Sequence, residues 1–434
     1  MADEQNKPGE RPASSRRAFL GGALGAASLV AAGGAGFGIA RASEPDDNSG
    51  TGGRDTAAGA GASTATVPFY GEHQAGIATP AQSRLAFAAF DVTTQDPQRL
   101  QTMLAQWAAA AAQMTQGRPI GPVETAPTAP PIDTGEALGL PASNLTVTVG
   151  FGPSLFDDRF GLARFKPALL ENLPPLPGDM IQAERSHGDI GVQACADDPQ
   201  VAFHVIRNFA RLARGTAVMR WSELGFGRTS STSSHQQTPR NLMGFKDGTR
   251  NIKSEDTADF DDYVWVGDET DQPWLKGGSY LIARRIRMLI ESWDTDYLAD
   301  QEKVFGRFKD SGAPLTGAHE FDTPNLSAKK DGKYVIDLNA HIRLASPVSN
   351  GGKKILRRGY SYTDGIDPQT GLLDAGLFFI AYQKNPEEQF IRIQRQLGAR
   401  DNLNEYIHHT SSAIFAVPPG LSGAGDYYGR PLFS

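Results

Sequence analysis

One pattern of strands and helices occurs twice in this chain, and that repeat constrains the fold more than any other feature. In each half, a predicted strand runs through a short polar turn into a helix that begins at a proline, as helices often do. The two prolines, Pro199 and Pro386, lie 187 residues apart. A period of this length is too long for a solenoid and predicts two copies of one α+β unit.

Alternating apolar residues and apolar stripes locate the elements of both copies. They predict two antiparallel sheets with helices packed on them, and a ligand held largely by the second copy. The helix after Pro199 carries its stripe on Val201, Val205, Phe209 and Leu212. The other predicted elements are strands 84–92, 145–151 and 189–196 with helix 96–113 in the first copy, and strands 280–290 and 377–382 with helices 294–305 and 386–398 in the second.

The N-terminus has the pattern of a twin-arginine export signal. Arg16-Arg17 precedes an uncharged run rich in Ala and Gly, and Ala40-Arg41-Ala42 is typical of a cleavage site. A transmembrane anchor is the alternative, but a run diluted by Gly and Ala is only weakly hydrophobic, so we expect no permanent membrane span. Residues 1–42 therefore predict export by the twin-arginine machinery to the cell envelope, the periplasm or the outside of the cell.

The mature chain is expected to begin with a linker and to continue as two domains. Residues 43–65 are mostly Gly, Ala, Ser, Thr and Asp with almost no large apolar side chains, so they predict a flexible linker. The repeat then divides the chain into an N-terminal domain, 66–225, and a C-terminal domain, 226–434.

Composition and cysteine content exclude several classes of partner and site. The chain has 39% hydrophobic and 21% charged residues and a net charge of −7, without a basic stripe, so we expect no nucleic-acid partner. Cys195 is the only cysteine, which excludes an intramolecular disulfide and cysteine-based zinc or iron–sulfur sites. Any metal must be held by His, by carboxylates or by a porphyrin. The oligomeric state, a homo-oligomer included, stays open.

A glycine-flanked aspartate stands in the second half, in Gly244-Phe245-Lys246-Asp247-Gly248. Glycines on both sides allow positive φ or a close approach of the backbone to a flat ligand, and they would aim Asp247 into a cavity. The same residues are equally typical of a tight turn. The residues of this loop alone leave both interpretations open.

This loop resembles the Gly-x-x-Asp-Gly signature of dye-decolorising (Dyp-type) haem peroxidases. Five further blocks resemble that family in order and spacing. They are residues 67–80, 306–315, 341–345, 356–362 and 379–383. The resemblance covers nearly the whole mature chain, and exported twin-arginine members of the family include deferrochelatases.

The resemblance implies two ferredoxin-like domains in the dimeric α+β barrel fold of the family, with one haem b bound mainly by the C-terminal half. It implies a peroxidase that reduces hydrogen peroxide and oxidises dyes, phenols or other small aromatic reductants. His341 would be the axial iron ligand, Asp247 the distal acid/base, and Arg357 the distal arginine that stabilises charge as the O–O bond breaks. The other cofactor contacts that it implies are Gly248, Thr249, Arg250, the propionate candidates Arg307 and Arg343, and the apolar wall of Leu377 and Phe379.

The axial histidine has a rival in the residues themselves, because His319 and His341 are equivalent candidates without the resemblance. The spacing to Asp247 and Arg357 in the family favours His341. A carboxylate usually orients such a ligand, but the sequence does not locate it, since Asn385 stands where relatives often have an acid. Three alternatives to a peroxidase remain: a deferrochelatase that removes iron from haem, a non-catalytic haem carrier, and a non-haem iron oxygenase that uses His319, Asp322 and His341.

Overall fold

The computed structural model describes residues 63–433. The predicted export signal and most of the predicted linker lie outside these residues. Ser63 and Ala65 accept hydrogen bonds from the backbone N–H groups of Ser143 and Asn144, at 3.0 and 2.9 Å. In the described part of the chain, no helix is both long and apolar enough to cross a membrane.

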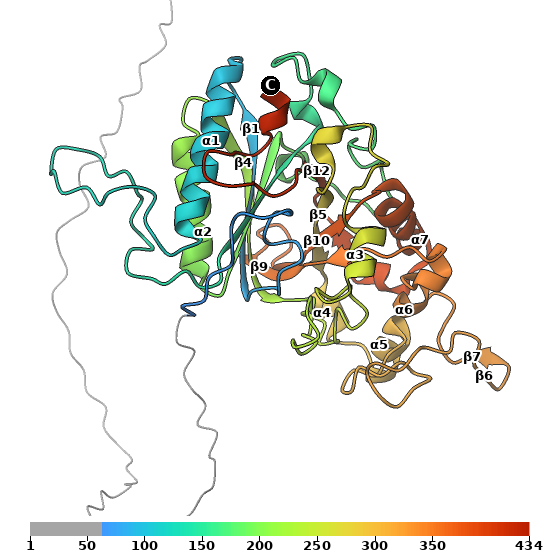
Figure 1. Cartoon of the computed structure of the whole chain (residues 1–434). Coiled ribbons are helices and arrows are strands. Elements are labelled where there is room, and N and C mark those ends of the chain that lie inside the picture. Colours follow the sequence, from blue (N-terminus) through green and yellow to red (C-terminus); the bar gives the residue numbers. More distant parts are fainter. Residues whose placement is uncertain (1–62, 434) are drawn as a thin grey trace, which may run out of the picture. The chain divides into compact units, whose positions relative to one another are not determined.

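The first half folds as a β-α-β-β-α-β unit (Figure 1). Its four strands lie in the order β2-β3-β1-β4, and every pair is antiparallel, which is the ferredoxin-like arrangement. Asp198 caps the second helix by accepting from the N–H groups of Gln200 and Val201. The elements are β1 (Arg84–Val92), α1 (Pro97–Met114), β2 (Thr146–Phe151), β3 (Ile190–Ala196), α2 (Pro199–Leu212) and β4 (Ala217–Arg228).

The second half has the same strand order, β9-β10-β5-β12, with longer segments between its strands. The two-copy expectation is therefore confirmed. The elements are α3 (Thr257–Tyr263), β5 (Ser279–Met288), α4 (Ile290–Trp293), α5 (Leu298–Phe305), β6 (Lys329–Lys330), β7 (Lys333–Tyr334), α6 (His341–Leu344), β8 (Leu356–Arg357), β9 (Tyr360–Ile366), β10 (Leu373–Gln383), α7 (Arg392–Arg400), β11 (Ile407–His409) and β12 (Ala413–Val417).

The two sheets join edge to edge into a closed barrel. Strand β4 pairs with β9, β12 pairs with β2, and β5 pairs with β10. The ring therefore runs β5-β12-β2-β3-β1-β4-β9-β10 and returns to β5. Side chains fill the inside of a barrel of this size. Strand β1 shows the alternation, because Leu85 and Phe87 face this interior whereas Ala86 and Ala88 face the helix side.

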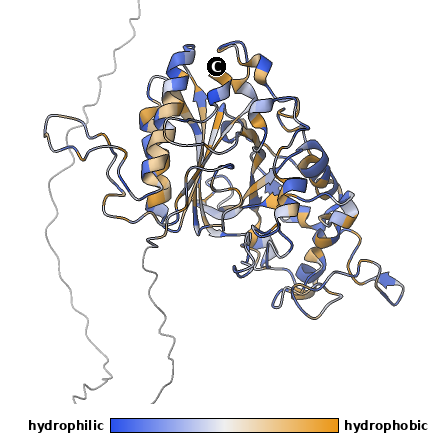
Figure 2. Cartoon of the chain, viewed as in Figure 1, coloured by the Kyte–Doolittle hydropathy of each residue, from blue (hydrophilic) through white to orange (hydrophobic). Residues whose placement is uncertain are grey.

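The outer face of the first sheet is covered directly by α1 and α2 (Figure 1). Trp107 of α1 stacks on Phe209 of α2 with 4.5 Å between ring centroids, and both side chains are fully buried. Figure 2 shows that apolar residues are frequent along both helices, whereas the β6–β7 hairpin is hydrophilic. The first half thus closes its helix–sheet interface with side chains alone.

One predicted element differs in the structure. Only the second part of the predicted helix 294–305 is helical, as α5, while its first residues form a turn after the short helix α4. Asp294 is the C-cap of α4 rather than the start of a helix, and Tyr297 precedes α5 with an extended backbone. The polar and acidic residues between the two helices satisfied the helical pattern, but the chain turns there to place Trp293 in the core.

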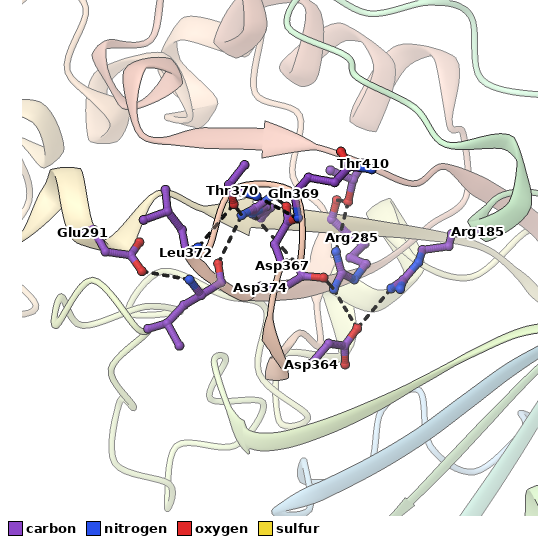
Figure 3. Close-up of polar contacts among 12 residues, drawn as sticks. Arg185, Arg285, Glu291, Asp364, Asp367, Gln369, Thr370, Leu372, Asp374 and Thr410 are labelled. Atoms are coloured by element: carbon purple, nitrogen blue, oxygen red, sulfur yellow. Dashed lines mark hydrogen bonds and ion pairs between the residues drawn. The ribbon is translucent and has the colours of Figure 1, made fainter.

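A charged network surrounds the buried side chain of Arg285, and Figure 3 shows its contact with Asp364. Arg285 on β5 binds Glu223 of β4 at 3.0 Å, Asp364 of β9 at 2.8 Å and Asp374 of β10 at 3.0 Å. Asp364 also binds Arg185 at 3.1 Å. The network joins strands from both halves across the barrel interior, on the opposite face of β5 from the cavity described next.

Candidate active site

A cavity lies on the outer face of the second sheet, where the first half has its packed helices. Its lining residues surround about 730 Å³ of empty space, part of which is open to solvent. Strand β10 contributes Leu377 and Phe379, and β5 contributes Arg284, Ile286 and Met288. The remaining lining comes from the loops and from α6, α7 and β11: Asn241, Met243, Asp247, Phe305, His341, Arg357, Phe390, Gln394, Leu397, Asp401, Leu403, Asn404, Ile407 and His409.

His341 begins the short helix α6 and is held by a carboxylate. Its Nδ1 lies 2.6 Å from Oδ2 of Asp401, which is buried at the end of α7. The second oxygen of Asp401 accepts from the N–H of Leu403 at 2.9 Å, so the carboxylate is itself fixed. A carboxylate only accepts hydrogen bonds, so Nδ1 carries the proton and Nε2 keeps a lone pair for a metal.

The electrostatics of His341 agree with a ligand role. Burial by itself would lower the pKa of His341, but the Asp401 carboxylate raises it above its ordinary value. The side chain of His341 is 32% exposed, and it lines the cavity. Asp247 and Arg357 also act on its pKa, with opposite signs. All three residues therefore belong to one electrostatic unit.

Asp247 and Arg357 form an ion pair in the same cavity. Nη1 of Arg357 donates to Oδ1 of Asp247 at 2.6 Å, and Nδ2 of Asn241 lies 3.4 Å from the other oxygen. Both members of the pair are partly exposed, at 28% for Arg357 and 18% for Asp247. A charge-assisted pair with access to a cavity can exchange protons and stabilise negative charge there.

Local structure explains why these two side chains meet. Gly244 and Gly248 have positive φ values of 84° and 86°, as the sequence predicted for glycines that flank Asp247. A Cβ at Gly248 would lie 2.8 Å from Cα of Ser230, so no other residue fits. Asn251 then holds the backbone of Arg357 with both arms of its amide, each at 2.8 Å.

The structure brings together five of the ten residues that the sequence singled out. Asp247, Arg357, His341, Leu377 and Phe379 line the cavity. The other five are not among its lining residues. They are Gly248, Thr249, Arg250, Arg307 and Arg343.

Arg307 and Arg343, the two propionate candidates among those five, donate hydrogen bonds to backbone carbonyl oxygens. Arg307 donates to the carbonyl oxygens of Gly312 and Glu320, at 2.6 and 3.1 Å. Arg343 donates to three carbonyl oxygens at 2.7–3.0 Å. Burial, together with the charges of Arg250 and Arg357, lowers the pKa of Arg307 to about 10. The roles predicted for Arg307 and Arg343 stay predictions.

The rival ligand set is not assembled at the cavity. His319 is exposed and does not line it, and Asp322 accepts hydrogen bonds from the backbone N–H groups of Ala318 and His319. Among residues 63–433, no three His, Cys, Asp or Glu side chains are grouped so that they could hold a metal ion. The non-haem reading of His319, Asp322 and His341 therefore has no geometric support.

Comparison with known families decides the class of the chain. The Dyp-type peroxidase N-terminal family matches residues 74–227, and the Dyp-type peroxidase C-terminal family matches residues 238–422. The chain belongs to the Dyp-type peroxidase family. The predicted family, its α+β fold, its haem cofactor and its peroxidase class are thereby confirmed.

Dyp-type relatives match along most of their length. The deferrochelatase of Escherichia coli K12 is 39% identical over 370 residues, which cover 84% of this chain and 86% of that protein. The oxyferrous/water mixed complex of DtpA from Streptomyces lividans has a TM-score of 0.78 at 39% identity, over 85% of this chain and 98% of that one. A DyP-type peroxidase from Cellulomonas bogoriensis has a TM-score of 0.77 at 39% identity, over 86% and 100% of the two chains.

Sequence reasoning missed several residues of this Dyp-type site. Asp401 is the carboxylate that the sequence could not locate; Asn385 instead caps the next turn by accepting from the N–H groups of Glu387 and Glu388. Asp401 lies 60 residues after His341, so no local motif links them. Arg284 and His409 were missed because a strand arginine and one of eight histidines carry no signal of their own.

Proposed function

We propose that His341 is the axial iron ligand of a haem peroxidase in which Asp247 and Arg357 activate hydrogen peroxide. The observation that supports this assignment is the convergence of the His341–Asp401 pair and the Asp247–Arg357 pair on one cavity. A carrier of haem would need the first pair but not the second. The two pairs together favour catalysis.

The cavity suits the cofactor in its chemistry. Ten of its lining residues are apolar, among them Met243, Met288, Phe305, Leu377 and Phe379. A mostly apolar pocket with a few placed polar groups is the usual form of a cofactor site. Nε2 of His341 would hold the iron, with Asp401 fixing the orientation of the ring. When bound, haem would supply an iron that binds hydrogen peroxide and takes up its oxidising equivalents.

The distal pair would move one proton and stabilise one charge. Asp247 would accept a proton from the inner oxygen of hydrogen peroxide and return it to the outer oxygen, which leaves as water. Arg357 would stabilise the negative charge that develops on the leaving oxygen, and Asn251 would keep it in place. Dyes, phenols and other small aromatic compounds are the reductants that we propose.

A rapid-mixing experiment tests the assignment. Haem-loaded protein is mixed with hydrogen peroxide and then with a phenol or a dye, and the absorption of the haem is followed through repeated cycles. A peroxidase consumes one hydrogen peroxide for every two one-electron reductants and keeps its haem. Haem that reacts no faster in the protein than free in solution would contradict the proposal.

Deferrochelatase chemistry is the second candidate, because the curated relatives at 39% identity carry that name. It makes a different prediction from the same cavity. Haem incubated with the protein would lose its iron, while free porphyrin accumulates and is measured by its fluorescence. A peroxidase without this activity would leave both the iron and the porphyrin in place.

We also propose export by the twin-arginine pathway and a division into domains 66–225 and 226–434. The export proposal rests on Arg16-Arg17 and on the cleavage pattern at Ala40-Arg41-Ala42. Replacing both arginines by lysine should retain the unprocessed protein in the cytoplasm. The same mature N-terminus in both strains would contradict this proposal.

A further inference from the structure

A second charged group lines the cavity and has no part in the proposed chemistry. Arg284 lies on β5, on the same face as Ile286 and Met288, so its side chain points from the sheet toward the cavity. Its side chain is only 1% exposed. A buried guanidinium must be paired, because an uncompensated charge in such a place costs several kcal/mol.

Only part of Arg284 is paired. Its Nη2 binds the carboxylate of Asp179, while Nε and Nη1 have no hydrogen-bond partner among residues 63–433. Such unsatisfied donors are rare in folded proteins and call for a partner outside the chain. Asp179 orients the guanidinium and leaves its other donors free.

His409 on β11 adds a further free donor beside Arg284. Its side chain is buried, its Nε2 lies 3.1 Å from Nε2 of Gln394, and its Nδ1 has no partner in the described residues. Burial and the positive charge of Arg284 lower the pKa of His409 to about 3. The ring is therefore neutral, and with Nε2 accepting from the amide of Gln394, Nδ1–H is a donor.

These donors mark one end of an otherwise apolar cavity. Along β5 and β11, Arg284 and His409 lie toward one end, and Met288 and Ile407 pair at the other. That second end joins the apolar cluster of Met243, Phe305 and Leu403. An amphipathic ligand with acidic groups on one edge would match this polarity.

We propose that Arg284 and His409 form a carboxylate-binding subsite that takes a propionate of the haem. The inference rests on the proposed haem site and assigns the orientation of the porphyrin within it: carboxylates toward Arg284 and vinyl groups toward Met288 and Phe305. It differs from the expectation for Arg307 and Arg343, whose donors already bind backbone carbonyl oxygens. A carboxylate accepts from Arg and His donors at once, which satisfies both.

Esterification of the propionates tests the subsite without any mutation. Apo-protein is titrated with haem and with haem dimethyl ester, and binding is followed by absorbance. We expect haem to bind at least about 10-fold more tightly than the ester, since a hydrogen bond to a charged group contributes about 1.5–3 kcal/mol. Equal affinities would overturn the subsite but leave the proposed function intact, whereas no binding of either compound would overturn both.

Variants then assign the preference to Arg284. Arg284→Met should reduce the ratio of ester to haem dissociation constants to near one, and the exposed Arg207→Met should keep it. Because Arg284→Met leaves Asp179 unpaired, the double variant with Asp179→Asn is measured as well, and urea unfolding checks that both apo-proteins are folded. A ratio that survives in these variants but is lost in Arg343→Met would contradict the assignment.

A third experiment tests whether the subsite binds a haem propionate or the carboxylate of a substrate. Benzoate is titrated into haem-loaded wild type and haem-loaded Arg284→Met. If the subsite is filled by a propionate, the variant binds benzoate no more weakly than the wild type. Weaker benzoate binding in the variant, together with equal binding of haem and its ester, would show that the subsite serves a substrate instead.

Discussion

The two halves of this Dyp-type peroxidase share a strand order but fill the space outside their sheets differently. In the first half, α2 packs directly on β1 and β3, and Trp107 and Phe209 close the interface. In the second half, α7 and the segments around it leave a cavity against β5 and β10. The same topology therefore serves once as a packed core and once as a binding site.

The difference lies in the side chains rather than in the fold. The cavity side of the second sheet carries Arg284, a charge with unpaired donors that would destabilise an ordinary core. The helix side of the first sheet carries only small and apolar residues at the matching places, such as Ala86, Ala88 and Phe90 of β1. Local departures from good packing are expected where a protein binds or reacts.

The largest expected effect concerns the chemistry that we propose for the second half. Asp247→Ala in haem-loaded protein should slow the reaction with hydrogen peroxide by about 10²–10⁴-fold, because the proton relay is lost. Stopped-flow absorbance measures the rate, and the exposed Asp294→Ala is the control. If Asp247→Ala reacts as fast as Asp294→Ala, the second half has no catalytic pair.

The free energy of unfolding should depend more on side-chain packing in the first half than in the second. Trp107→Ala in the first half should lower the free energy of unfolding of the apo-protein by about 3–5 kcal/mol, because it opens a void in a closed core. Phe379→Ala should cost about 1–2 kcal/mol, since its ring already borders the cavity. Urea unfolding measures both changes. Equal costs would mean that the two halves are packed alike.

Glu223 tests the link between the halves, since it joins β4 to Arg285 of β5. Burial raises the pKa of Glu223 to about 7, against the opposing attraction of Arg285, and Asp364 adds to the rise while Arg185 lowers it. A folded-state pKa above the unfolded value means that the native protein binds more protons between about pH 4.5 and 7. Stability from this group is therefore present below pH 4.5 and is lost as the pH rises to 7.

The expected size is about 3 kcal/mol for a shift of roughly two and a half pKa units. The free energy of unfolding of wild type should fall by this amount, relative to Glu223→Gln, between pH 5 and pH 8. Urea unfolding across that range measures the difference. A constant difference would show that the attraction of Arg285 outweighs burial and keeps Glu223 charged throughout.

The smallest effect concerns the carboxylate that binds His341, the proposed axial ligand. Asp401→Asn should weaken haem binding by about 10- to 100-fold, because the orienting partner of a metal-bound histidine contributes about that much. The ring of His341 would lose its acceptor while its position in α6 stays the same. Haem titration measures the change, and Asp96→Asn at the start of α1 is the control. Unchanged affinity would make Asp401 a structural residue only.

Five of the eight barrel strands could be predicted from local pattern. Strand 84–92 was predicted with its observed bounds, and the prolines at 199 and 386 located the start of equivalent segments. Strands β4, β9 and β12 escaped prediction. Strand β4 exposes Val218 and Leu224 and buries Glu223, so its apolar alternation is broken by the charged network that it enters.

The candidate site divides in the same way. The resemblance to the family singled out Asp247, Arg357 and His341, because each stands in a segment that is similar to a family motif. Asp401, Arg284 and His409 could not be found in the sequence, because only their contacts with a distant residue or with the cavity place them at the site.

The sequence by itself determined the duplicated α+β unit, because periodicity is a property of neighbours along the chain, and its resemblance to the family supplied the expected site residues. The tertiary structure alone decided that the two sheets close into one barrel, that a cavity lies on the outer face of the second sheet, and that Asp401 supports His341 there. These depend on packing and charge between segments up to hundreds of residues apart. Such long-range energies leave no periodic trace in the chain.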